Sequence, residues 1–123
     1  MSQKTILLVD DSAVAMMNEK MILRSCGKYA LLEAKDGAEA VAVAKAEKPD
    51  LIVMDIVMPK MNGIDACRVL RSQEATKEIP IIMVTTRGEV ENVEAGYAAG
   101  CNDYITKPVN SAELMKKVEN LIG

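Results

Sequence analysis

The chain lacks histidine, tryptophan and phenylalanine, and its only aromatic residues are three tyrosines. Without histidine, neither histidine-based general base catalysis nor histidine ligation of a metal is available. With so few aromatic residues, the core must be aliphatic, and we expect the nine methionines to act as adaptable filler within it. Three widely spaced cysteines, Cys26, Cys67 and Cys101, argue against a disulfide framework and for a reducing, cytoplasmic compartment.

The charge and the apolar runs are also limited. The 15 basic residues are scattered and the net charge is −3, so we expect no nucleic-acid partner. No apolar run approaches the roughly 20 residues of a membrane span and no signal peptide is evident, so no membrane association is expected. A length of 123 residues suits one domain, 1–123, with no output domain after the last helix.

Short apolar runs alternate with helical patterns along the chain. The strand-like segments are 6–9, 30–32, 51–54, 81–84 and 103–106. The helical patterns are 14–23, 38–47, 64–71, 89–99 and 111–122. Ser12 and Ser111 are suitable N-caps for the first and last helices. In the first helix, we expect Val14, Met17, Met21 and Leu23 to form the buried stripe.

This alternation predicts an α/β protein with a doubly wound, five-stranded parallel sheet and helices on both faces. The strand order 2-1-3-4-5, typical of flavodoxin-like folds, places the topological switch between the first and third strands. Ligands in such sheets bind beyond the carboxyl ends of the strands, at the switch point. The residues that follow each strand are therefore the candidates for a functional site.

Polar residues follow four of the five predicted strands. Asp10 and Asp11 follow the first, Asp55 the third, Thr85 the fourth, and Lys107 the fifth. Carboxylates that converge on one sheet edge repel one another, so the site should raise a carboxyl pKa or bind a hard cation such as Mg²⁺. A carboxylate nucleophile, a cation and a hydroxyl together are the parts of a phosphoryl-transfer site. Asp55 is the predicted acceptor.

These residues carry a resemblance to the receiver domains of two-component response regulators. The matching segments are 7–12, 55–59 with 62–63, 84–85 and 103–108, and the resemblance covers the whole chain. It implies that a histidine kinase or phosphotransfer protein phosphorylates the residue at the position of Asp55. It further implies that the phosphorylated domain switches its binding to a downstream effector, without being an enzyme except toward its own phosphorylation and dephosphorylation.

The resemblance also implies individual roles. Asp10, Asp11, Asp55 and the backbone carbonyl of Val57 would hold Mg²⁺. Thr85 and Lys107 would bind the phosphoryl group, and Tyr104 would change its rotamer together with Thr85 during the switch. The peptide bond before Pro108 would be cis.

Each feature also has an ordinary explanation, because strand-end aspartates, threonines and lysines commonly serve in turns and caps. The residues after the first strand disfavour two other functions. A phosphatase of the haloacid dehalogenase type needs Asp-x-Asp after the first strand, where this chain has Ser12 as the third residue. A flavodoxin-like electron carrier needs a phosphate loop rich in Ser, Thr and Gly, where this chain has Asp10 and Asp11.

Overall fold

The computed structural model describes residues 3–86 and 90–123, and it leaves the side chains of Thr86 and Val90 undescribed. Glu89, the expected start of the fourth helix, therefore lies outside the described residues. The elements run β1 (Lys4–Val9), α1 (Ala13–Arg24), β2 (Tyr29–Ala34), α2 (Gly37–Glu47), β3 (Leu51–Asp55), α3 (Gly63–Ser72), β4 (Ile81–Thr86), α4 (Val90–Ala99), β5 (Asp103–Lys107) and α5 (Ser111–Ile122).

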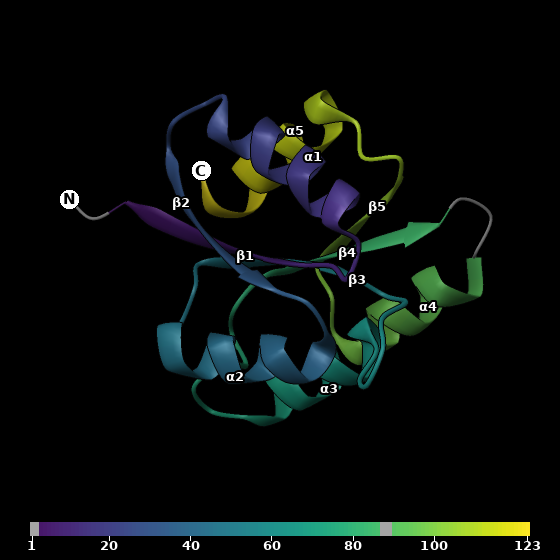
Figure 1. Ribbon diagram of the computed structural model, residues 1–123. Coiled ribbons are helices and arrows are strands. Elements are labelled where there is room, and N and C mark those ends of the chain that lie inside the picture. Colours follow the sequence, from purple (N-terminus) through teal and green to yellow (C-terminus); the bar gives the residue numbers. More distant parts are fainter. Residues whose placement is uncertain (1–2, 87–89) are drawn as a thin grey trace.

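The strands form one parallel sheet in the order β2-β1-β3-β4-β5, as predicted. Helices α1 and α5 cover one face of this sheet, and α2, α3 and α4 cover the other (Figure 1). The register pairs Val9 of β1 with Met54 of β3. The carboxyl ends of the two strands at the switch point are therefore level with each other.

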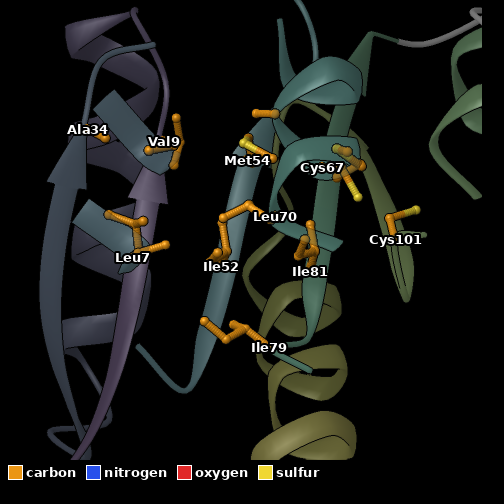
Figure 2. Close-up of a cluster of buried hydrophobic side chains, with 14 of the residues drawn as sticks. Leu7, Val9, Ala34, Ile52, Met54, Cys67, Leu70, Ile79, Ile81 and Cys101 are labelled. Carbon is orange, nitrogen blue, oxygen red and sulfur yellow. The ribbon is translucent and has the colours of Figure 1, made fainter. Parts of the chain in front are cut away.

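Two apolar clusters, one on each face of the sheet, form the core. Alternate residues of the central strands point to opposite faces, so Leu7, Ile52 and Ile81 belong to one cluster, while Leu8 and Val53 belong to the other. Figure 2 shows the first of these clusters, where the strand side chains meet Cys67 and Leu70 of α3. Because the central strands are buried on both faces, they have continuous apolar sequences, and their carboxyl ends have fixed positions.

Side-chain caps set the start of several helices. The hydroxyl of Ser12 accepts a hydrogen bond from the backbone N–H of Ala15 at 3.2 Å, as the sequence predicted. At α5, however, the cap is Asn110, whose Oδ1 accepts from the N–H of Glu113 at 3.0 Å. The prediction of Ser111 was wrong by one residue, because asparagine and serine cap helices about equally well and the two are adjacent here.

The predicted buried stripe of α1 was wrong at three of its four positions. Val14, Met17 and Met21 are 78%, 60% and 65% exposed, whereas Leu23 is buried as expected, and the helix buries Met16 and Glu19 with it. Both sets have helical spacing, so periodicity alone does not decide which stripe faces the sheet. A glutamate stands where an apolar residue would be expected, and two of the methionines are not core filler.

None of the helices in the described part of the chain is both long and apolar enough to cross a bilayer.

Candidate functional site at the carboxyl edge of the sheet

Three aspartates meet at the carboxyl edge of β1 and β3. Asp10 and Asp11 directly follow β1, and Asp55 is the last residue of β3. One carboxylate oxygen from each lies within 4.8 Å of the others. Asp10 and Asp55 are buried, at 2% and 7% exposure, whereas Asp11 is exposed. The neighbouring strands thus bring together the carboxylates that the sequence placed at two separate strand ends.

Backbone contacts fix the positions of the two buried aspartates. Oδ1 of Asp10 accepts a hydrogen bond from the backbone N–H of Ser12 at 2.9 Å, which holds the turn that leads into α1. At the other strand, a Cβ on Gly63 would lie 2.3 Å from the backbone oxygen of Asp55. Glycine is therefore required where the start of α3 packs against the end of β3.

Lys107, the last residue of β5, places its ammonium between the two buried carboxylates. Its Nζ donates a hydrogen bond to Oδ2 of Asp55 at 3.0 Å and lies 3.1 Å from Oδ2 of Asp10. The second contact is an ion pair without hydrogen-bond geometry, so Oδ2 of Asp10 is buried with no hydrogen-bond partner among the described residues. One ammonium does not neutralise three carboxylates, so the groups that the structure describes in this site have an excess of negative charge.

Burial and charge shift the protonation equilibria in this site. Burial raises the pKa of Asp55 above its ordinary value, the hydrogen bond from Lys107 opposes this rise, and the charge of Asp10 adds to it. Burial alone would lower the pKa of Lys107, but its interactions with Asp55 and Asp10 raise it overall. The ammonium form of Lys107 is thus held firmly next to a carboxyl group that ionises less readily than usual.

Two further residues of the predicted site lie on β4 and in the loop after β3. Thr85 follows Val84, the residue of β4 that pairs with Asp55, and its side chain is 4% exposed. The structure does not describe the side chain of Thr86, the other hydroxyl residue at this strand end. Val57 is in the loop after β3, with its side chain 63% exposed. The roles of Thr85 and of the Val57 carbonyl remain predictions.

Tyr104 belongs to a second polar group on β5, α4 and α5. Its ring is half-buried and packs edge-on against Tyr97, with centroids 6.1 Å apart. The ammonium of Lys117 lies 5.6 Å from the Tyr104 ring and 2.8 Å from a carboxylate oxygen of Asp103. The Lys107–Pro108 peptide bond that follows β5 is cis, as expected from the resemblance.

Glu19 is a further charged residue close to the site, and it was not anticipated from the sequence. It is 1% exposed on α1, and neither carboxylate oxygen has a hydrogen-bond partner within the described residues. Its pKa is raised to about 8, first by burial and then by the charge of Asp10, with Lys107 acting in the opposite direction. Its spacing of three and four residues from Met16 and Leu23 is helical, but the exposed residues Val14, Met17 and Met21 have a similar spacing, so the sequence holds no signal that singles out Glu19.

The donor set fits a hard cation of the Mg²⁺ type. All three clustered ligands are carboxylates, one of them is exposed, and a buried oxygen of Asp10 has no hydrogen-bond donor in the described chain. Mg²⁺ prefers oxygen ligands, keeps several waters and needs only one or two carboxylates. The exposed Asp11 leaves one side of the cluster open to water and to a phosphate group.

Comparisons with known proteins agree with this geometry. The family model described as "Response regulator receiver domain" matches residues 6–119. Protein PilH of Pseudomonas aeruginosa is 40% identical over 96% of this chain and 97% of its own length. The phosphate regulon transcriptional regulatory protein PhoB of the same organism is 41% identical over 97% of this chain but only 52% of its own length.

A solved structure gives the same result in three dimensions. The receiver domain of the sensor histidine kinase PA1611 of Pseudomonas aeruginosa, reported with a magnesium ion in its active-site cleft, superposes with a TM-score of 0.91. It is 36% identical, and the match covers 99% of each chain. The chain therefore belongs to the response regulator receiver domain family and is a receiver domain of two-component signalling.

Proposed function

We propose that Asp55 accepts a phosphoryl group and that this reaction depends on Mg²⁺. The observation that carries the proposal is the position of the Lys107 ammonium, within 3.1 Å of carboxylate oxygens of both Asp10 and Asp55. A cation so placed can bind an incoming phosphoryl oxygen while it keeps Asp55 ionised. Receiver domains take phosphoryl groups from histidine kinases, so a histidine kinase or phosphotransfer protein is the proposed donor.

Each residue of the site has a separate task in this scheme. An oxygen of Asp55 forms the new bond to phosphorus while the bond from phosphorus to the leaving group breaks. Lys107 binds one equatorial oxygen, and the Thr85 hydroxyl is proposed to bind another. When bound, Mg²⁺ supplies positive charge to the transferring group, and Asp10, Asp11, Asp55 and the carbonyl of Val57 would hold it. The domain thereby promotes its own phosphorylation and dephosphorylation, and we do not assign it any other reaction.

The proposed output is a change in the face formed by α4, β5 and α5. Thr85 is the penultimate residue of β4 and Lys107 the last residue of the neighbouring β5, so a phosphoryl group bound by both would shift the two strands together. Tyr104 lies in the same face and would then change its rotamer. A downstream protein that binds the phosphorylated state more tightly would shift the population toward it. Because PhoB is a transcriptional regulator, the absence of a nucleic-acid partner remains a prediction from charge alone.

The test is phosphorylation by acetyl phosphate, monitored by intact-mass spectrometry. We expect one phosphoryl group per chain in the presence of Mg²⁺ and none after chelation of divalent cations. The Asp55→Asn variant should remain unlabelled, because the amide removes the nucleophile.

Asp65→Asn is the matched control, because Asp65 is an exposed aspartate in the first turn of α3 that does not belong to the three clustered carboxylates, and it should label like the wild type. Labelling of the Asp55→Asn chain at the wild-type level would refute the assignment.

A further inference from the structure

A pocket separates α1 from the segment that joins β5 to α5. Its volume is about 710 Å³, within the range of small-molecule sites. One wall comes from α1 and the other from the β5–α5 connection, with lining residues that include Ala15, Asn18, Glu19, Lys107, Pro108 and Val109. The pocket lies beside the aspartate cluster and shares only Lys107 with the proposed phosphoryl site.

Glu19 makes this pocket unusual. The side chain is 1% exposed, and both of its carboxylate oxygens lack a hydrogen-bond partner in the described structure. Most buried polar groups are hydrogen-bonded, because an unpartnered one costs about 1–3 kcal/mol of stability. An apolar residue at this position would avoid that cost, since Met16 and Leu23 lie on the same face of the helix. The two oxygens therefore form an acceptor pair with no partner from the described chain.

The charged side chains next to the pocket favour a positively charged ligand over a negatively charged one. Among the described residues of the site, Asp10, Asp11 and Asp55 carry three negative charges against one positive charge on Lys107, which is already engaged with Asp10 and Asp55. An anion would be repelled by this excess, whereas a cation would be attracted. The apolar surfaces of Pro108 and Val109 in the same pocket suit the aliphatic part of such a ligand.

We propose that this pocket binds a compact organic cation: the carboxylate of Glu19, closed to solvent in this structure, turns into the pocket and accepts hydrogen bonds from a primary ammonium or guanidinium group, while a short aliphatic chain packs against Pro108 and Val109. Such a cation would stabilise the ionised form of Glu19, whose pKa of about 8 in the unliganded chain reflects burial without a partner. The same chemistry is available from a free amine or from a lysine or arginine side chain of a partner protein. The proposal does not depend on phosphoryl transfer to Asp55.

The test uses methylguanidinium as the probe, added to the ¹⁵N-labelled 123-residue chain both without divalent cations and with saturating Mg²⁺, because bound Mg²⁺ offsets the excess charge of the aspartate cluster and leaves the carboxylate of Glu19 as the remaining attraction. We expect saturable NMR shifts for amides of α1 near Glu19 and for Val109. Glu19→Gln keeps the shape and removes the charge, and it should weaken binding by about tenfold or more. Wild-type affinity in the Gln variant, or no saturable shift up to about 50 mM probe, would overturn the proposal.

Two controls separate the pocket from general charge effects. Ala15→Leu adds bulk to the α1 wall without changing charge, and it should also weaken binding. Glu113→Gln removes an exposed carboxylate from α5 and should bind like the wild type. If Ala15→Leu binds normally while Glu113→Gln does not, the probe follows surface charge and the proposal fails.

A second arm distinguishes the two sources of the cation. A blocked tripeptide with a central arginine is compared with methylguanidinium under the same conditions. Tighter binding of the peptide supports a partner side chain as the occupant, and equal affinities support a free small cation. Labelling by acetyl phosphate, measured separately, reports on Asp55 alone, so the two proposals can fail independently.

Discussion

Asp55 and Glu19 are both buried carboxyl groups near the carboxyl edge of the sheet, at 7% and 1% exposure, but their surroundings differ. Oδ2 of Asp55 accepts a hydrogen bond from Lys107, whereas neither oxygen of Glu19 has a hydrogen-bond partner in the described part of the chain. Burial raises the pKa of both groups, and only Asp55 has a hydrogen bond from a cation that opposes the rise. The two carboxyl groups therefore differ in whether a hydrogen bond from a cation reaches them, and not in whether they are buried.

This difference indicates what each group is suited to do. In the proposed reaction Asp55 must be ionised when the phosphoryl donor arrives, and the hydrogen bond from Lys107 favours the ionised form against the effect of burial. Glu19 has no such support, so its neutral form is favoured up to a pH of about 8. It is suited to respond to a cation that comes from outside the chain. Changes in pH, in Lys107 and in bound Mg²⁺ should each affect Asp55 and Glu19 differently.

The largest expected effect is the pH dependence of stability due to Glu19. In the unfolded chain this group ionises near 4.5, and in the folded chain near 8, so between these values the folded state binds more protons. Stability should therefore fall with rising pH in this window, by at most about 1.4 kcal/mol per pH unit from this group. Urea denaturation from pH 5 to 8 should show a flatter profile for Glu19→Gln than for the wild type.

Glu113→Gln, which changes an exposed carboxylate, should reproduce the wild-type profile. Parallel profiles for the wild type and Glu19→Gln would contradict the assignment.

Lys107→Met should leave Asp55, like Glu19, as a buried carboxyl group without a hydrogen bond from a cation. The substitution keeps the aliphatic stem and leaves Asp10 and Asp55 without their ammonium, so the free energy of unfolding at pH 7 should fall by about 1–3 kcal/mol. The loss should shrink as the pH falls, because burial raises the pKa of Asp55 and its protonation relieves the repulsion. We expect acetyl phosphate to change the tyrosine fluorescence of the wild type, and the variant should lose most of that change. An unchanged fluorescence response would remove Lys107 from the proposed switch.

Mg²⁺ should stabilise the folded chain by binding to the aspartate cluster, and it should not change the pH dependence of stability that Glu19 causes. At ten times its dissociation constant, a ligand specific to the folded state adds about 1.4 kcal/mol to the free energy of unfolding. Asp11→Asn, at the exposed position of the cluster, should lose most of this gain in thermal denaturation with and without Mg²⁺. If Mg²⁺ also abolished the difference in pH profile between the wild type and Glu19→Gln, Glu19 and the aspartate cluster would not act as independent sites.

Ser12→Ala should have the smallest effect and should leave both carboxyl groups unchanged. It removes the cap of α1 and should cost about 1 kcal/mol of stability, but it keeps the backbone N–H that binds Oδ1 of Asp10. Mg²⁺ affinity, measured by calorimetry, should therefore equal that of the wild type. Ser111→Ala is the matched control and should be near neutral, because Asn110 caps α5. A large loss of Mg²⁺ affinity in Ser12→Ala would show that its hydroxyl belongs to the site.

The order of elements and the residues at the strand ends could be read directly from the sequence. Continuous apolar runs such as 51–54 are typical of strands buried on both faces, and a run that ends in Asp55 places that residue at the functional edge. The orientation of α1 could not be read in the same way. The spacing 14, 17, 21 and the spacing 16, 19, 23 are equally helical, and the second contains a glutamate that sequence reasoning assigns to the surface.

The sequence by itself determined the α/β alternation and the identity of the groups at each strand end, because local apolar patterns and strand-terminating residues are properties of short segments. The tertiary structure alone decided which carboxyl groups have a partner. Lys107 is 52 residues from Asp55 in the chain and reaches it only because β5 and β3 end at the same edge of one parallel sheet. Glu19 is buried without a hydrogen-bond partner among the described residues because α1 turns that face toward the sheet, and this depends on packing across the whole domain.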